Sequence, residues 1–128
     1  MLYILIAWHA ILVQCSRLAV LSLVCVGEYW PEYACNGKEN TKVSDFLCHR
    51  AAMHGFQGSM PSLDYRDWDS WVSAWANQAP FREPGTTQGY HALTFGWLVG
   101  ELVRRVDGRS VGQYFKEEIA EPFGLDFR

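Results

Sequence analysis

Paired cysteines are absent from this 128-residue chain. Its four cysteines stand at positions 15, 25, 35 and 48, so no Cys-x-x-Cys spacing occurs, and the last 80 residues contain no cysteine. Neither a zinc ribbon nor a disulfide scaffold is therefore indicated, and we expect buried free thiols. Cys48, His49, His54 and His91 match no common zinc spacing either. We expect no metal and no other cofactor.

Basic charge is also scarce. Lysine and arginine total 11 against 14 acidic residues, which gives a net charge of −3 and a pI near 5.7. A nucleic-acid-binding domain presents a clustered basic face, whereas the basic residues here are scattered, so we expect no nucleic-acid partner. The length suits one domain or a piece of a larger one.

An uninterrupted apolar run of membrane-spanning length does not occur. Residues 1–27 are the most apolar part of the chain, but Gln14, Ser16 and Arg17 interrupt them. A membrane span needs about 20 largely apolar residues. Three interpretations stay open: a membrane anchor, a core helix followed by a buried strand-like segment, or a start that is not a natural domain start. We treat residues 1–25 as an apolar helical segment and residues 26–128 as a partial domain.

Alternating strand patterns are absent, and helical spacing takes their place. We expect helices over residues 41–49, 92–107 and 110–121, and a further helix that begins at Asp64 or Asp67 and ends near residue 78. Thr41 is the expected N-cap of the first, and Ser110 with Gln113 forms a capping-box-like pair at the start of the last. Gly108 is expected to end the third helix.

The first candidate site lies in residues 80–108. Proline and glycine make the backbone irregular over residues 84–89, and a long amphipathic helix is predicted to begin just after Tyr90 and His91. A phenol and an imidazole at the first turn of a buried helix could do chemistry. The competing interpretation is an ordinary amphipathic pair that covers the helix N-terminus, and the spacing alone favours that one.

The second candidate is a tryptophan stripe. Trp68, Trp71, Val72 and Trp75 stand at i, i+3, i+4 and i+7, so they share one helix face. Core packing is the simpler interpretation, because each indole buries a large area. The stripe could also wall an acyl pocket, so we keep Trp75, together with His91, as a candidate binding residue.

Two stretches resemble one enzyme family. The segment at residues 89–125 reads GYHALTFGWLVGELVRRVDGRSVGQYFKEEIAEPFGL. It is similar to the segment that carries the second catalytic motif of serine β-lactamase-like hydrolases, and within them to the class C β-lactamase and family VIII carboxylesterase branch. Residues 29–53, YWPEYACNGKENTKVSDFLCHRAAM, resemble the stretch between the first and second motifs. The likeness covers about residues 26–128.

The resemblance implies acyl transfer. In this family a serine attacks an ester or lactam carbonyl, a lysine three residues later assists, and a tyrosine moves protons; that tyrosine maps onto Tyr90, as general base. The asparagine of the Tyr-x-Asn motif is replaced by Ala92, as in esterase-like members, which disfavours lactam turnover more than ester hydrolysis. The family usually has glycine where Ala52 stands, which indicates an altered turn.

The nucleophile motif itself is absent. A catalytic serine and its lysine need Ser-x-x-Lys spacing, because one helical turn then brings the ammonium beside the hydroxyl. No serine of this chain has lysine three residues later, and no Lys-Thr-Gly-like third motif occurs. A phenol, with a reference pKa of about 10, acts as a base near neutrality only beside cations. Tyr90 is therefore predicted to lack its partners.

These observations predict a mainly α chain, equivalent to the helical portion of the β-lactamase/transpeptidase-like (α+β) fold with its sheet largely missing. The first functional hypothesis is a partial β-lactamase-related serine hydrolase, which acts on a small-molecule ester or lactam in the intact family and is catalytically incomplete as given. The alternative is a non-catalytic helical interaction module that could associate with a membrane through residues 1–27.

Overall fold

The computed structural model describes residues 23–59 and 61–126. Its elements are η1 (Val26–Glu28), η2 (Pro31–Tyr33), α3 (Val43–Leu47), α4 (Trp68–Asn77), α5 (Phe95–Asp107), α6 (Val111–Phe115) and η3 (Lys116–Ala120). The only β pairing within these residues is an isolated bridge between Cys25 and Lys42. The prediction of a mainly helical chain is confirmed for this part of the molecule.

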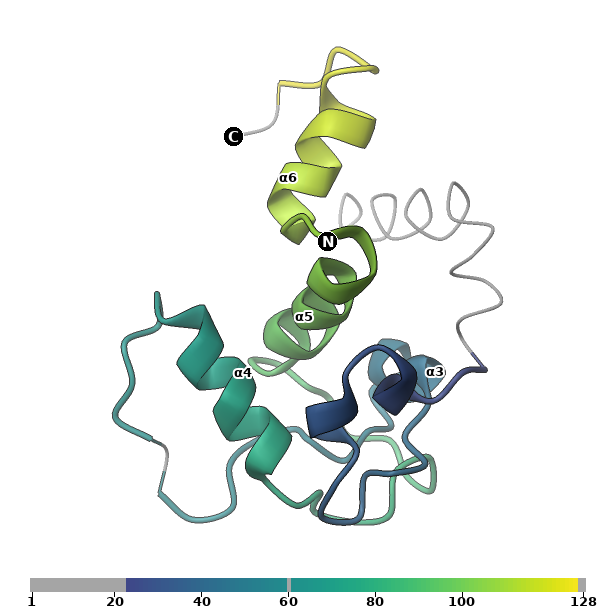
Figure 1. Cartoon of the computed structure of the whole chain (residues 1–128), viewed down its shortest axis with the longest axis vertical. Helices are drawn as coiled ribbons and strands as arrows, with labels where there is room; N and C mark the ends of the chain where they lie inside the picture. The colour runs from purple at the N-terminus through teal and green to yellow at the C-terminus, as the bar shows by residue number, and fades with distance from the viewer. Residues whose placement is uncertain (1–22, 60, 127–128) are drawn as a thin grey trace.

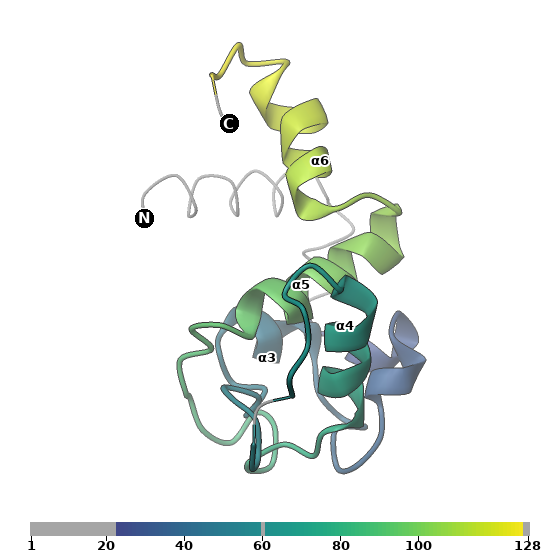
Figure 2. The same ribbon diagram turned by 90° about the vertical axis from the view of Figure 1, so that its left-hand side faces the viewer.

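Helix α5 is the centre of the arrangement. Figure 1 shows it between α4 on one side and α3 on the other, and both helices contact it. In both views α6 and the segment after it project away from the other helices (Figure 2). One apolar core fills the space among α3, α4, α5 and the two short helical turns η1 and η2; its largest members are Trp30, Tyr33, Phe46, Met53, Trp71, Trp75 and Leu98.

Helix α4 forms where the tryptophan stripe predicts it. Asp67 is the N-cap, and its carboxylate accepts the Ser70 N–H at 3.2 Å. At the other end the buried Lys38 ammonium donates to the Ala76 carbonyl at 3.0 Å and also to the Gln78 carbonyl. These bonds satisfy carbonyls that the end of a helix leaves free. The core-packing interpretation of the stripe is confirmed for Trp71 and Trp75, which are both buried.

Helix α5 begins at Phe95, three residues after the predicted start at Ala92. Tyr90 and His91 therefore precede the helix and do not form its first turn, which corrects the prediction. The reason is that His91 is bonded to the loop of residues 49–53 through both its backbone and its ring. The predicted end is confirmed: Gly108 takes a left-handed conformation with φ of 89°, and its N–H donates to the Arg104 carbonyl at 2.9 Å.

Helix α3 is shorter than predicted. Its N-cap is Lys42, whose N–H donates to the Asp45 carboxylate at 2.9 Å, while Thr41 is buried one residue earlier. The helix ends at Leu47 instead of His49, because His49 adopts a φ of 58°, which a right-handed helix excludes.

The predicted start of the last helix is confirmed, since the Ser110 hydroxyl accepts the Gln113 N–H at 3.1 Å. Helix α6 continues into the wider turn η3, and Tyr114 and Ile119 form a small cluster of their own there.

The described cysteines are free, as predicted, but they are not buried. Cys25 and Cys35 are half-buried, and Cys48 is exposed. The expectation of buried thiols is therefore wrong for these three, because each lies in a loop at the surface and not on the inner face of a helix.

No helix within residues 23–59 and 61–126 is long and apolar enough to cross a bilayer. The hypotheses about residues 1–25 and 1–27 concern mainly residues 1–22, which lie outside the described part of the chain.

Ala52 carries backbone strain that glycine would relieve. Its φ is 54°, in the left-handed region, and the residue is 5% exposed. A left-handed conformation costs an L-residue about 1–2 kcal/mol, whereas the entropic cost of glycine is about 0.5–1 kcal/mol. We expect Ala52→Gly to raise the free energy of unfolding by about 0.5–1 kcal/mol, measured by chemical denaturation followed by circular dichroism.

Ala51→Gly is the matched control for that substitution. Ala51 is fully buried next to Ala52 but has no positive φ, so glycine at position 51 should lower the free energy of unfolding. Equal destabilisation by both substitutions would contradict the assignment of strain to Ala52.

Candidate functional site

Tyr90 lies at the surface, at the end of the loop that leads into α5. The residue is 74% exposed, whereas the next residue, His91, is 1% exposed. The ring of Tyr90 meets the ring of His49 edge to face, with centroids 5.0 Å apart. No hydrogen bond to the Tyr90 hydroxyl and no cation stacked on its ring occurs within residues 23–59 and 61–126.

The backbone on both sides of Tyr90 is tied to the loop of residues 49–53. The Gly89 N–H donates to the His49 carbonyl at 2.9 Å, and the His91 N–H donates to His49 Nδ1 at 3.3 Å. In return, the Met53 N–H donates to His91 Nε2 at 3.1 Å. His49 therefore has a hydrogen-bonded structural role in this loop.

These bonds determine which ring nitrogens carry protons. Because Nδ1 of His49 and Nε2 of His91 accept hydrogen bonds, the proton of each neutral ring is on the other nitrogen. Burial, and then the neighbouring imidazoles of His49 and His54, lower the pKa of His91 to about 4. Burial also lowers the pKa of His49. Both rings are therefore neutral, and able to accept, at pH 7.

The two candidate binding residues lie inside the molecule. Trp75 is 1% exposed, and its ring stacks on Phe56 with a centroid separation of 3.9 Å and lies near Trp71 and Trp97. The ring of His91 faces the loop of residues 49–53, as described above. Tyr90 and His91 are adjacent in sequence and lie together beside the His49 ring. Trp75 lies apart from them in the core, and its ring pairs with neither of their rings.

An apolar groove runs along the outer face of α5. Its volume is about 620 Å³, and it lies between α5, the start of α4 and the start of α6. Leu93, which is 64% exposed, follows Tyr90 by three residues and belongs to this groove. At Gly100 an added Cβ would lie 2.7 Å from the Trp68 ring, so glycine is required for the close approach of α4 to α5. Other lining residues are Tyr65, Trp97 and Val111.

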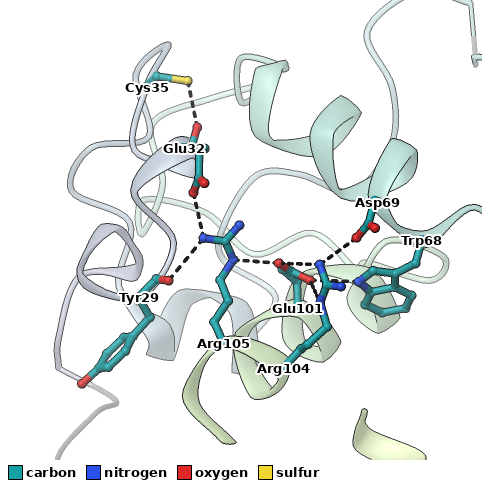
Figure 3. A network of polar contacts seen from close by, with 8 residues as sticks. All are labelled: Tyr29, Glu32, Cys35, Trp68, Asp69, Glu101, Arg104 and Arg105. Atoms are coloured by element: carbon teal, nitrogen blue, oxygen red, sulfur yellow. Dashed lines mark hydrogen bonds and ion pairs between the residues drawn. The ribbon is translucent and has the colours of Figure 1, made fainter. Parts of the chain in front are cut away.

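A buried carboxylate, Glu101, anchors α5 to its neighbours (Figure 3). It is 0% exposed and accepts hydrogen bonds from Arg104 Nε at 2.8 Å, Arg105 Nε at 2.7 Å and Trp68 Nε1 at 2.9 Å. Arg104 continues to Asp69 on α4 and Arg105 to Glu32 on η2, at 2.8 and 2.7 Å. Burial acts to raise the pKa of Glu101, but the hydrogen bonds from Arg104, Trp68 and Arg105 outweigh it and lower the pKa.

Sequence reasoning did not single out Glu101. The available signal was the spacing of Glu101 to Arg104 and Arg105, at i+3 and i+4, which brings opposite charges together on one helix face. The spacing did not show that this face would be buried.

The described part of the chain contains no group of three or more histidine, cysteine or acidic side chains arranged to hold a metal ion. Among the histidines, the ring of His91 lies 5.5 Å from that of His49 and 6.3 Å from that of His54, between centroids. One nitrogen of His49 and one of His91 already accept backbone hydrogen bonds.

Comparison with known proteins gives consistent matches. The sequence model of the Beta-lactamase family matches residues 20–126. Esterase/beta-lactamase LipL of Mycobacterium tuberculosis (strain ATCC 25618 / H37Rv) is 40% identical over 101 residues, which are 79% of this chain and 23% of that protein. The chain thus spans about a quarter of the length of this curated relative.

Solved structures match as well. A penicillin-binding protein homolog from Caulobacter crescentus has a TM-score of 0.82 and 40% identity, over 94% of this chain and 32% of that one. A family VIII carboxylesterase has a TM-score of 0.82 and 39% identity, over 92% and 32% of the two chains. EstA from Arthrobacter nitroguajacolicus Rue61a has a TM-score of 0.76 and 33% identity, over 91% and 31%.

Proposed function

The chain belongs to the Beta-lactamase family, and from that premise we propose that it is the helical portion of a serine hydrolase that uses Tyr90 to move protons. The resemblance stated for residues 29–53 and 89–125 is confirmed by the family match, which covers both. In the proposed reaction a serine attacks the carbonyl of a small-molecule ester or lactam and forms an acyl-serine intermediate. The sheet that completes the β-lactamase/transpeptidase-like fold is proposed to lie outside these 128 residues.

The observation that carries the proposal is the setting of Tyr90. Its phenol is exposed, while hydrogen bonds from Gly89 and His91 to His49 tie down the backbone on either side. A group that transfers protons to a bound substrate has to be both accessible and held in a fixed geometry. Tyr90 meets both requirements, and the resemblance maps the tyrosine of the family motif onto it.

Ester hydrolysis is the favoured reaction. Ala92 replaces the asparagine of the Tyr-x-Asn motif. An alanine methyl cannot donate or accept the hydrogen bonds that an amide side chain offers. The names of the relatives support the same choice, since one is an esterase/beta-lactamase and another a family VIII carboxylesterase.

We expect the isolated chain to be inactive. It has no Ser-x-x-Lys motif, so no lysine one helical turn from a serine is present to generate the nucleophile. The measurements are p-nitrophenyl butyrate turnover and fluorophosphonate labelling, with the family VIII carboxylesterase as the positive control. Covalent labelling of any serine in this chain would overturn the claim of incompleteness.

A graft tests the hydrolase proposal directly. Residues 26–126 replace the matching region of the family VIII carboxylesterase, a substitution that its TM-score of 0.82 and 39% identity over 92% of this chain make feasible. We expect the grafted carboxylesterase to hydrolyse p-nitrophenyl butyrate. A folded graft without turnover would contradict the proposed function.

One observation favours the alternative, a non-catalytic helical interaction module. The groove of about 620 Å³ along α5 is largely apolar, and exposed apolar surface of this kind often marks a site of association. The graft separates the two hypotheses, because a module that only binds a partner is not expected to preserve turnover when it replaces part of a hydrolase.

A further inference from the structure

We propose that His49 and His91 are positioning residues, which hold Tyr90 in place by offering unprotonated ring nitrogens to backbone N–H groups. The inference rests on the proposed function, because it concerns how the Tyr90 site is fixed and how pH regulates it. The structural evidence is a set of three hydrogen bonds between residues 89–91 and residues 49–53.

His49 bonds to both neighbours of Tyr90. Its carbonyl accepts the Gly89 N–H at 2.9 Å and its Nδ1 accepts the His91 N–H at 3.3 Å. The left-handed backbone of His49, with a φ of 58°, ends α3 at this point. A positive φ is uncommon for a residue other than glycine and has to be sustained by the surrounding contacts.

His91 adds a bond in the opposite direction. Its ring is buried, and Nε2 accepts the Met53 N–H at 3.1 Å, so the loop that accepts hydrogen bonds from both neighbours of Tyr90 also donates one to the residue after Tyr90. The ring of His49 then packs against three aromatic rings: Phe95 at 4.8 Å, Tyr90 at 5.0 Å and His91 at 5.5 Å between centroids. The phenol and the start of α5 are therefore positioned by the same imidazole.

Protonation removes both ring acceptors. An imidazolium carries N–H groups on both nitrogens and cannot accept, so each protonated ring would face a backbone N–H donor. The titratable groups that face His91 are the imidazoles of His49 and His54, and those that face His49 are His91 and the phenol of Tyr90. A proton on one imidazole thus opposes a proton on the next.

The lowered pKa of His91 makes the stability of the folded chain depend on pH. The pKa of His91 in the folded chain, about 4, lies below its usual value of 6.5 because of burial and the two neighbouring imidazoles. The unfolded chain therefore binds more protons between these values, and stability falls as the pH falls. The contribution of neutral His91 is complete above pH 6.5 and is lost as the pH approaches 4.

Two conservative substitutions separate hydrogen bonding from protonation. His49→Asn keeps an acceptor oxygen close to the Nδ1 position, and asparagine tolerates a positive φ. His91→Gln keeps an acceptor oxygen close to the Nε2 position. Neither amide titrates, so both variants should preserve the bonds and make them independent of pH. His91→Leu removes the acceptor, and His54→Asn is the matched control, because the exposed His54 accepts no backbone bond among the described residues.

The experiment is amide hydrogen exchange of the full chain at pH 7 and pH 4, with Met53 and His91 as reporters and the Tyr90 ring signals recorded in parallel. After correction for intrinsic exchange, we expect protection of Met53 to fall about 10-fold at pH 4 in the parent chain. In His54→Asn it should fall at least as much, because that variant keeps the bond from Met53 to His91 and loses one of the imidazoles that lower the pKa of His91. His49→Asn should make the protection of the His91 N–H independent of pH. His91→Gln should do the same for the Met53 N–H. His91→Leu should lose protection of Met53 at both pH values.

Unchanged pH dependence in His91→Gln, or retained Met53 protection in His91→Leu, would overturn the proposal. If His91→Leu does not fold, the comparison of His91→Gln with the parent chain decides alone. No turnover is measured, so the positioning role can fail while the grafted carboxylesterase remains active, and the reverse is equally observable.

Discussion

Replacing Tyr90 with phenylalanine in the grafted carboxylesterase is expected to lower kcat for p-nitrophenyl butyrate by about 10²- to 10⁴-fold. This is the range that a positioned proton-transfer group contributes. Phenylalanine keeps the ring that packs against His49 and loses only the hydroxyl, so the fold and the groove should be unchanged. The KM should change little, because the hydroxyl is proposed to act on the reacting proton and not on ground-state binding.

Tyr65→Phe in the same graft is the control for that loss. Tyr65 is also exposed and aromatic, but it stacks on Trp71 and lines the groove along α5. Removing its hydroxyl should leave kcat within about twofold of the parent graft, as expected for a group outside the proton-transfer step. A similar kcat in Tyr90→Phe and Tyr65→Phe would exclude Tyr90 as the proton-transfer residue.

Glu101→Gln is expected to lower the free energy of unfolding by about 3 kcal/mol at pH 7. Removing one partner of a buried ion pair costs about 3–5 kcal/mol, because the remaining charge loses its compensation. The lower end applies here, since Arg104 and Arg105 are partly exposed and keep Asp69 and Glu32 as second partners. Urea denaturation followed by circular dichroism measures the change.

The same substitution has a predictable effect on the acid response. The pKa of Glu101 is lowered from 4.5 by its hydrogen bonds, which outweigh burial. The ionised carboxylate therefore contributes stability above pH 4.5, and this contribution is lost as the pH falls through the folded-state pKa. The parent chain should lose more stability than Glu101→Gln between pH 6 and pH 3.

Glu118→Gln is the control for Glu101→Gln. Glu118 pairs with Arg109 at 2.9 Å, but its side chain is 41% exposed, so solvent screens the pair. The expected change is about 0–1 kcal/mol. Equal effects of the two substitutions would show that burial adds nothing to the importance of Glu101.

The helix boundaries show which signals in the sequence were sufficient. Gly108 and Ser110 each act on a helix end within four residues of themselves, and both were placed correctly. For α4 the sequence left Asp64 and Asp67 open as the first residue, and the structure selects Asp67 as the N-cap. The starts of α3 and α5 were misplaced by one and three residues. The error at α5 has a non-local cause, because His91 is bonded to His49 and Met53, which precede it by 42 and 38 positions in the sequence.

The candidate site divides in the same way. The sequence by itself determined the helical class, the family and the absence of Ser-x-x-Lys, because each of these depends on residue type and short spacing, and it supplied the proposal that Tyr90 is the motif tyrosine. Only the tertiary structure decided that Tyr90 is exposed beside a buried His91, and that Glu101 is the buried centre of an ion network. Trp68 and Glu101 are 33 positions apart, and Arg105 and Glu32 are 73 apart. Burial and charge pairing at such separations arise from packing, which no local pattern specifies.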